Sequence, residues 1–173
     1  MSLKSTPALE DFTNNRKSEN IITGIGIDLT HNFFKQNKIN VLIHCAHDFK
    51  ETSYKKSYQV NVLSSLQLFK NASTAGVKKI IFISSMASHY KNNSIYSRIK
   101  KDIEEITIKS NGIVVKPSLI VGANPGGIFK TMNNIVKKSY VIPLVSSKNQ
   151  TLYTVNDLEL SEFIKKVIFY NKY

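Results

Sequence analysis

The feature that most constrains the fold of this sequence is an alternation of short, nearly continuous apolar runs with longer segments of helical periodicity. Residues 41–46 and 78–85 are apolar runs of the length expected for strands that are buried on both faces of a parallel sheet. Between them, Tyr58, Val62 and Leu66 recur at intervals of four residues, which is typical of one face of an amphipathic helix. Two strands joined through a helix by short connections predict a β-α-β unit with a right-handed crossover.

The same alternation continues on both sides of this unit. The predicted strands cover residues 21–27, 41–46, 78–85 and 113–121. The predicted helices cover residues 32–36, 54–75, 95–109 and 157–170, with a further helix after the loop at 122–127. Gly76 and the Asn111-Gly112 pair are turn residues that can end two of these helices. In the further helix, we expect Phe129, Met132 and Val136 to point inward.

Length and composition agree with one α/β domain. The 173 residues are 42% hydrophobic and 21% charged, which is a globular balance. No internal repeat or linker interrupts the order of elements, so we place a single domain at residues 21–173, after a flexible N-terminal segment at residues 1–20. The order of elements predicts a doubly wound parallel sheet with flanking helices.

Neither membrane attachment nor disulfide bonding is expected. The apolar stretches fall far short of the roughly 18 residues that span a bilayer, and the first residues lack the apolar core of a secretory signal. Cys45 is the only cysteine, so no internal disulfide can form, and its apolar surroundings predict a small buried side chain. We therefore expect a cytoplasmic protein without a membrane partner.

The formal net charge of +12 raises the question of nucleic-acid binding. Nearly all the basic residues are lysines, with only Arg16 and Arg98 as arginines, whereas bidentate recognition of phosphates and guanines favours arginine. The lysines also occur in pairs spread along the whole chain. We therefore favour scattered, solvated charge and keep a basic nucleic-acid-binding module as a minor alternative.

The candidate chemistry lies where parallel sheets place their ligands, beyond the carboxyl ends of the strands. Tyr96 and Lys100 are four residues apart and share one face of a predicted helix. An ammonium about 4 Å from a phenol, at an effective dielectric of about 20, favours the phenolate by about 4 kcal/mol and brings the tyrosine pKa near neutrality. Ser85, at the end of the preceding strand, can bind the same substrate oxygen. Tyr96 would then exchange a proton with an alcohol or a ketone.

The tyrosine-lysine pair is weak evidence when taken alone. The chain has 8 tyrosines among its 173 residues and is rich in lysine, so about one Tyr-x-x-x-Lys is expected by chance. An exposed tyrosine beside a solvated lysine is the alternative interpretation. The serine-ended strand eleven residues before Tyr96 favours the catalytic interpretation. A metal site is not expected, because His44 and Cys45 alternate between the two faces of a strand and no third ligand is apparent.

The order of segments resembles the extended short-chain dehydrogenase/reductase superfamily, specifically its NAD-dependent epimerase/dehydratase family. The resemblance covers about residues 21–170. The matching segments are 26–30, 41–46, Asn61-Val62, 75–85, Tyr96 to Lys100 with Glu104, 115–117, 121–125 and 153–158. It implies an incomplete Rossmann-like sheet that binds NAD or NADP, and a nucleotide sugar or a related small molecule as substrate.

The resemblance also implies roles for individual residues. Ser85, Tyr96 and Lys100 match the catalytic positions of the family. The implied cofactor contacts are Asp28, Leu29, Cys45, Ala46, Asn61, Tyr96, Lys100 and Pro117. The spacing to His89-Tyr90 is one residue out of step with the family, which leaves Ser84 and Met86 as alternatives to Ser85. Tyr153 and Asp157 match a substrate-side segment, although a helix cap also explains Asp157.

The main departure from the family is the missing Gly-x-x-Gly-x-x-Gly turn, whose backbone N–H groups hold the cofactor pyrophosphate. Gly24 and Gly26 do not replace it, because they precede Asp28 and lack a third glycine. Lys116 also stands where the family usually has arginine, and most of the C-terminal substrate lobe is absent. We therefore expect weakened cofactor binding.

A truncated sheet leaves several alternatives open. Either the family's third strand moves in beside the fourth, or another chain covers the gap. The protein is then an epimerase/dehydratase-like enzyme, a non-catalytic remnant, or half of a split enzyme. A homo-oligomer or a complementing N-terminal piece are the partners that these alternatives imply.

Overall fold

The computed structural model describes residues 20–23, 29–89, 93–122, 127–138 and 153–169. Its main sheet has four parallel strands in the order β1-β2-β3-β4. These strands are β1 (Asn20–Thr23), β2 (Val41–His44), β3 (Lys79–Ile83) and β4 (Ile113–Val115). Strands that follow one another in the sequence are neighbours in the sheet, and each parallel pair is joined through a connection that contains a helix. The predicted Rossmann-like α/β architecture is therefore confirmed.

The first strand lies directly beside the second. Asn20 pairs with Val41 and Thr23 with His44, so β1 takes the position next to β2, which is the first of the two arrangements expected for a truncated sheet. The predicted strand at 21–27 is seen only as far as Thr23. Asp28, and all of the N-terminal segment 1–20 except Asn20, lie outside the described residues.

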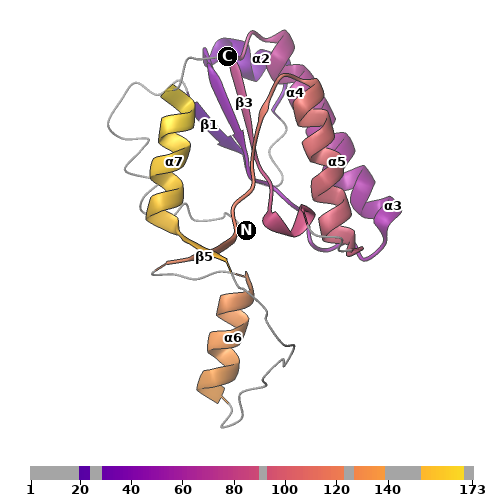
Figure 1. The fold of residues 1–173 in the computed structure, drawn as a ribbon. Helices are drawn as coiled ribbons and strands as arrows, with labels where there is room; N and C mark the ends of the chain where they lie inside the picture. Colours follow the sequence, from indigo (N-terminus) through magenta and orange to yellow (C-terminus); the bar gives the residue numbers. More distant parts are fainter. Residues whose placement is uncertain (1–19, 24–28, 90–92, 123–126, 139–152, 170–173) are drawn as a thin grey trace.

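Helices cover both faces of the main sheet (Figure 1). One face carries α2 (His31–Gln36), α4 (Ser64–Thr74) and α5 (Ile95–Lys109), and the other carries α7 (Asp157–Phe169). Alternate strand residues point to opposite sides. Leu42 and Phe82 therefore belong to the core on the α4–α5 side, whereas Ile43 and Ile81 belong to the core on the α7 side. Each such burial contributes about 1.5–3 kcal/mol, so the apolar runs are explained by packing on both faces.

The long helix predicted over residues 54–75 is continuous but not uniform. It begins as α3 (Tyr54–Ser57), widens into a π-helical stretch (Tyr58–Leu63) and continues as α4. Gly76 follows it with a φ of +88°, the left-handed conformation that glycine adopts without strain. π-Helical turns are frequent at functional sites, and this one contains Asn61.

Helix α5 has the bounds that its periodicity predicts. The Ser94 side chain caps it by accepting a hydrogen bond of 3.2 Å from the Ser97 N–H. Asn111 has a φ of +54° and ends the turn after the helix. A Cβ on Gly112 would lie 2.7 Å from the Thr107 methyl group, so glycine is required for the close approach that starts β4. A short 3₁₀ helix, Met86–Ser88, connects β3 toward α5.

Two predictions beyond β4 are wrong. The strand predicted at 113–121 is two strands, because β5 (Leu119–Val121) pairs in parallel with β6 (Thr154–Asn156) in a separate sheet. Pro117 lies at the break, where its missing N–H cannot continue the ladder.

The inward orientation predicted for Val136 is also wrong, since this residue is 51% exposed. It lies on α6 (Gly127–Lys138), which stands apart from the main sheet (Figure 1), so no sheet face is there to cover it. The side chains of Phe129 and Met132 lie outside the description. Among the described helices, none is both long and apolar enough to cross a bilayer.

Candidate active site

The carboxyl ends of β2, β3 and β4 lie side by side, where a parallel sheet places its ligands. Two backbone hydrogen bonds join the last two of these ends. The Ser84 N–H donates to the Val115 carbonyl at 2.7 Å, and the Met86 N–H donates to the Pro117 carbonyl at 2.9 Å. The segments that follow β3 and β4 are therefore held together beyond the sheet.

The structure brings Ser85, Tyr96 and Lys100 together at the end of β3. Ser85 caps the short 3₁₀ helix, and its hydroxyl also hydrogen-bonds the Tyr96 phenol. Lys100 donates from Nζ to the Ile83 carbonyl at 3.0 Å, and Nζ lies 5.8 Å from the centre of the Tyr96 ring. The first turns of α5 thus carry a phenol and an ammonium to the strand tip that bears Ser85.

The Lys100 ammonium is deeply buried, with the residue only 3% exposed. Burial lowers its pKa to about 8, although the neighbouring Cys45 and Glu104 raise it. The Phe82 ring lies 4.7 Å from Nζ and provides a cation-π contact. Among the described residues, Nζ donates only to the Ile83 carbonyl, so further N–H donors of the ammonium remain for a ligand.

The expected lowering of the Tyr96 pKa is not observed. Burial raises this pKa, and the hydrogen bond from Ser85 lowers it only in part. The reason is positional, because the Lys100 ammonium is turned toward the Ile83 carbonyl and not toward the phenol oxygen. Tyr96 is therefore protonated at neutral pH in this arrangement.

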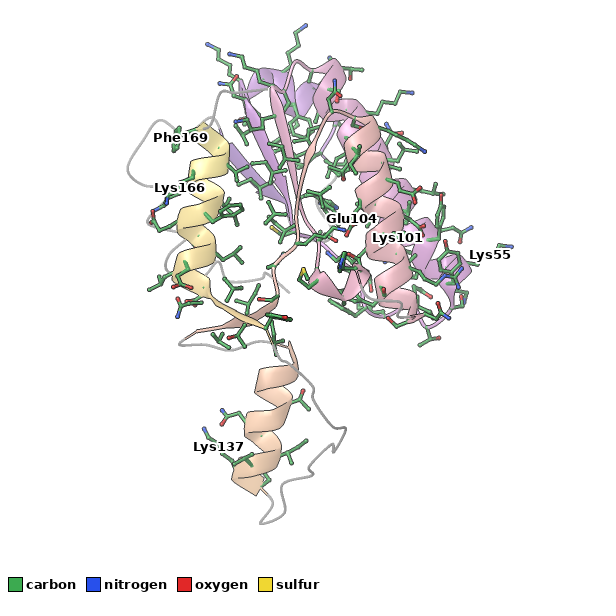
Figure 2. The ribbon with its side chains drawn as sticks, in the orientation of Figure 1. Lys55, Lys101, Glu104, Lys137, Lys166 and Phe169 are labelled. Carbon is green, nitrogen blue, oxygen red and sulfur yellow. The ribbon has the colours of Figure 1, made fainter. Side chains whose placement is uncertain are left out.

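A buried carboxylate connects α5 to both strand tips. Glu104 Oε2 lies 2.6 Å from Lys116 Nζ, and Oε1 accepts hydrogen bonds from Ser84 and Ser88. Burial by itself raises the Glu104 pKa, but these three partners outweigh it and hold the pKa below its usual value. Figure 2 shows Glu104 on the side of α5 that faces the sheet. Ser84 is thus engaged by Glu104, while Ser85 hydrogen-bonds Tyr96.

Asn61 holds the loop that follows β2. Its side-chain oxygen accepts from the Asp48 N–H at 2.7 Å, and its amide nitrogen donates to the carbonyls of Asp48 and Ser57 at 3.1 Å. The side chain is buried within the π-helical stretch. Asn61 therefore positions the strand tip, and any contact between its side chain and a cofactor remains a prediction.

The remaining residues that were predicted to contact the cofactor differ in how deeply they are buried. Leu29 is buried in the core on the α4–α5 side, and its carbonyl accepts a hydrogen bond from Asn71 Nδ2 at 3.0 Å. Pro117 is also buried, and Ala46 is half-buried. The buried position expected for Cys45 is wrong: β2 ends at His44, so Cys45 lies beyond the sheet and is exposed.

Sequence reasoning did not assign His47 and Phe49 to the site. The His47 ring lies edge-on to Tyr96, with ring centres 4.9 Å apart, and edge-on to Phe49 at 4.5 Å. Phe49 stacks on Tyr96 at 5.6 Å, with 18° between the planes. The only sequence feature that points to His47 is its position directly after a predicted strand. An irregular loop has no hydrophobic periodicity, so the sequence does not predict where the rings of His47 and Phe49 lie.

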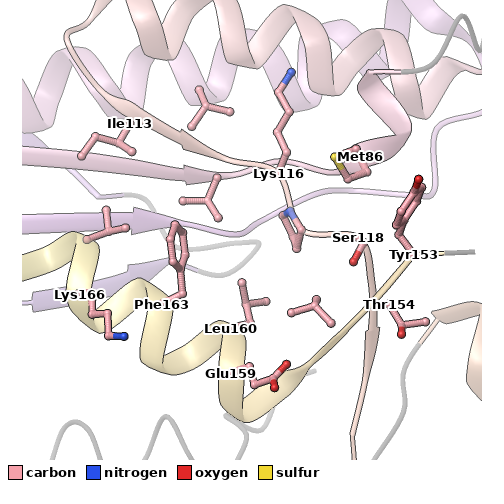
Figure 3. Close-up of a pocket in the computed structure, with 15 residues that line it drawn as sticks. Met86, Ile113, Lys116, Ser118, Tyr153, Thr154, Glu159, Leu160, Phe163 and Lys166 are labelled. Carbon is pink, nitrogen blue, oxygen red and sulfur yellow. The ribbon is translucent and has the colours of Figure 1, made fainter.

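An apolar pocket of about 960 Å³ lies between β4, β6 and α7 (Figure 3). Val115, Leu160 and Phe163 are among its apolar walls, and Met86 and Tyr153 line it next to the strand tips. Tyr153, which was predicted to face the substrate, therefore lines this pocket. Asn156 caps α7, since its Oδ1 accepts from the Leu158 N–H at 2.9 Å, and Asp157 is the first residue of that helix, with its Oδ1 2.9 Å from the same N–H. In the described part of the chain, no three His, Cys, Asp or Glu side chains converge as metal ligands.

A parallel α/β sheet with a Tyr-x-x-x-Lys helix at its carboxyl edge places the protein in the Rossmann-like class of α/β folds. A family model described as the NAD-dependent epimerase/dehydratase family matches residues 8–151, and the chain belongs to this family. Among curated proteins, "Protein fmp52, mitochondrial" of Emericella nidulans is 34% identical over 74 residues, which is 40% of this chain and 31% of that protein.

Solved structures of low sequence identity share the fold. TunA, an NAD-dependent NDP-hexosamine 5,6-dehydratase, has a TM-score of 0.69 and 14% identity, covering 82% of this chain and 55% of that one. The UDP-N-acetylglucosamine 4-epimerase of Bacillus cereus has a TM-score of 0.67 and 12% identity, covering 86% and 62%. WbmG of Bordetella bronchiseptica, solved with NAD, has a TM-score of 0.64 and 13% identity, covering 83% and 51%. The chain thus spans roughly half to three-fifths of the length of these neighbours.

Proposed function

We propose that this chain carries the catalytic centre of an NAD(P)-dependent enzyme that acts on a nucleotide sugar or a closely related hydroxylated substrate. The observation that carries the proposal is the meeting of Ser85, Tyr96 and Lys100 at the carboxyl end of β3. The substrate class is supported by the neighbours whose structures contain UDP or UDP-glucose. Family membership supports NAD as the cofactor.

Tyr96 is the residue that exchanges a proton with the substrate oxygen. Because burial keeps the pKa of its phenol high, it is suited to donate a proton to a carbonyl oxygen that is being reduced. Ser85 holds the same oxygen through its hydroxyl. A nicotinamide cofactor held beside Tyr96 and Lys100 would supply or accept the hydride at the substrate carbon.

Lys100 supplies positive charge near the proton-transfer residue, with Nζ 5.8 Å from the centre of the Tyr96 ring. With a pKa of about 8 it remains largely protonated at pH 7. In the oxidation direction, the ammonium favours loss of the Tyr96 proton once Nζ turns from the Ile83 carbonyl toward the phenol. Burial strengthens this electrostatic effect because little solvent screens it.

The residues fit the reacting end of the cofactor better than its pyrophosphate. No Gly-x-x-Gly-x-x-Gly turn occurs in the sequence, and each charge-assisted hydrogen bond that such a turn gives is worth about 1.5–3 kcal/mol. We therefore expect NAD affinity in the millimolar range. The missing turn also favours two alternatives. In one, this chain is half of a split enzyme, and a second polypeptide would provide the phosphate-binding turn. In the other, the chain is a non-catalytic remnant.

The experiment is turnover of UDP-glucose and UDP-N-acetylglucosamine with added NAD, with product detected by NMR, together with calorimetric titration of NAD and NADP. Tyr96→Phe is expected to lower kcat about 10²- to 10⁴-fold. Tyr58→Phe is the matched control, since Tyr58 packs against the core on the α4–α5 side.

Turnover that survives Tyr96→Phe contradicts the mechanism. Absence of NAD binding at millimolar concentration leaves the split enzyme or the remnant. The nucleic-acid alternative predicts instead that binding to duplex DNA falls steeply between about 50 and 200 mM salt.

A further inference from the structure

Beside the proposed proton-transfer residue lies a histidine that the mechanism above does not use. His47 is 8% exposed and packs edge-on against Tyr96 and Phe49. It reaches this place because the Asn61 side chain fixes the loop after β2 at the next residue, Asp48. His47 is therefore held against Tyr96 in two ways, by ring packing and by the hydrogen bonds that Asn61 makes to the backbone of the next residue, Asp48.

One ring nitrogen of His47 has no partner. Nδ1 is fully buried and makes no hydrogen bond with any described residue. A buried polar atom without a partner costs about 1–3 kcal/mol, so native structures rarely keep one without a reason. Because the His47 ring also contacts Tyr96, this unpaired nitrogen is expected to receive its hydrogen-bond partner from a bound ligand.

The charge around His47 indicates what kind of ligand group completes it. Burial and the nearby Lys100 ammonium lower its pKa to about 4, so the ring is neutral at pH 7. A neutral imidazole nitrogen either donates or accepts, depending on its tautomer, and a hydroxyl can do both. A neutral, hydroxyl-rich ligand therefore suits Nδ1 better than a phosphate or a carboxylate does.

The Phe49 ring, which packs against both His47 and Tyr96, has room to move. Phe49 stacks on Tyr96 but is 75% exposed, so few neighbours restrain its side chain. The exchange of this ring contact for contact with a ligand costs little packing, because most of the Phe49 surface is in solvent already.

We propose that Phe49 swings off Tyr96 when substrate enters, and that His47 Nδ1 then hydrogen-bonds a sugar hydroxyl next to the carbon whose oxygen Tyr96 serves. His47 is thus a specificity residue that selects hydroxylated substrates. This inference rests on the proposed function and deepens it.

The test reads the imidazole nitrogens directly by ¹⁵N NMR of histidine-labelled full chain, titrated first with NAD and then with UDP-glucose. The His47→Phe spectrum assigns the His47 signals. We expect the Nδ1 signal to move on addition of UDP-glucose, while the signals of His31, on α2 and hydrogen-bonded to Thr74, stay in place.

Two variants distinguish the effect of the Nδ1 hydrogen bond from the effect of ring packing. His47→Phe keeps the ring packing and removes the hydrogen bond, so the KM for UDP-glucose should rise about tenfold while the Kd for NAD is unchanged. His47→Asn places an amide near the Nδ1 position and should stay within about threefold of the parent chain. His31→Phe is the control, and thermal unfolding of each variant reports whether it folds.

The outcomes distinguish this inference from the proposed function. If NAD and UDP-glucose bind but Nδ1 does not move, or His47→Phe keeps the parental KM, the role of His47 is overturned and the proposed function stands. If neither ligand binds the parent chain, the proposed function fails, and the role of His47 fails with it.

Discussion

His44 shows what a single residue contributes at the strand tips. It is the last residue of β2, lies between the Phe69 and Phe82 rings, and shares a hydrogen bond of 2.8 Å with the Ser65 hydroxyl. Burial, with smaller contributions from Lys100 and His47, lowers its pKa to about 4. The neutral ring is therefore the form that the folded protein accommodates.

The lowered pKa of His44 makes stability dependent on pH. The unfolded chain binds the proton below about pH 6.5 and the folded chain only below about pH 4, so the stability is present above pH 6.5 and is lost as the pH falls toward 4. The loss amounts to about 3 kcal/mol for this residue. Denaturant unfolding across this pH range should show that the free energy of unfolding depends less on pH in His44→Phe than in the parent chain. Ser65 is not left unpaired in this variant, because its hydroxyl keeps its hydrogen bond of 2.6 Å to the Asn61 carbonyl. An unchanged slope would contradict this prediction.

At the scale of elements, the site depends on how α5 is joined to the sheet. Its inner face carries Ile99 and Ile103, which fix the helix by apolar packing. Lys100 and Glu104 then reach the ends of β3 and β4 from the same side. The apolar residues thus determine the position of the helix, and the two charged residues tie it to the strand tips.

Removal of the Glu104 charge should loosen these tips. Glu104→Gln weakens the hydrogen bonds from Ser84 and Ser88 and leaves Lys116 without its carboxylate, which should cost about 2–3 kcal/mol. Glu105→Gln changes the exposed neighbour on the same helix and should be within about 0.5 kcal/mol of the parent chain. Chemical denaturation measures both, and equal losses in the two variants would argue against the network.

At the scale of the whole molecule, the two faces of the sheet are covered unequally. Helices α2, α4 and α5 lie on one face, whereas among the described helices α7 alone lies on the other (Figure 1). The apolar pocket opens beside β4, where Ile113 and Val115 line it together with residues of α7 such as Phe163 (Figure 3). Apolar surface of this extent is expected to bind apolar molecules.

The pocket should bind an apolar dye. We expect fluorescence enhancement of anilinonaphthalene sulfonate by the folded chain, reduced several-fold in Phe163→Lys, because Phe163 forms one wall and a charge there wets the pocket. Phe169→Lys is the matched control, since Phe169 lies on the same helix outside the pocket lining. Equal dye binding by the parent and both variants would place the apolar surface elsewhere.

Local features of the sequence determined the elements that form the sheet and its α4–α5 face. The apolar run at 78–85 and the periodicity of 95–109 depend on neighbours in the chain, so β3 and α5 follow from them. Gly76 likewise marks a helix end, because its positive φ is a local requirement. The meeting of Ser85, Tyr96 and Lys100 follows from this order, since parallel strands end at the same edge.

Only the tertiary structure decided the features that depend on contacts between distant segments. Pro117 explains why the predicted strand at 113–121 is interrupted. The sheet that β5 joins is decided by its pairing with β6, more than thirty residues later in the chain. Val136 is exposed because α6 has no sheet to pack on, and Ser84 differs from Ser85 because Glu104 reaches only the former. The contact between the His47 and Tyr96 rings also depends on segments that are distant in the sequence. Periodicity reports which residues of an element are apolar, whereas contacts and burial depend on the elements that pack against it.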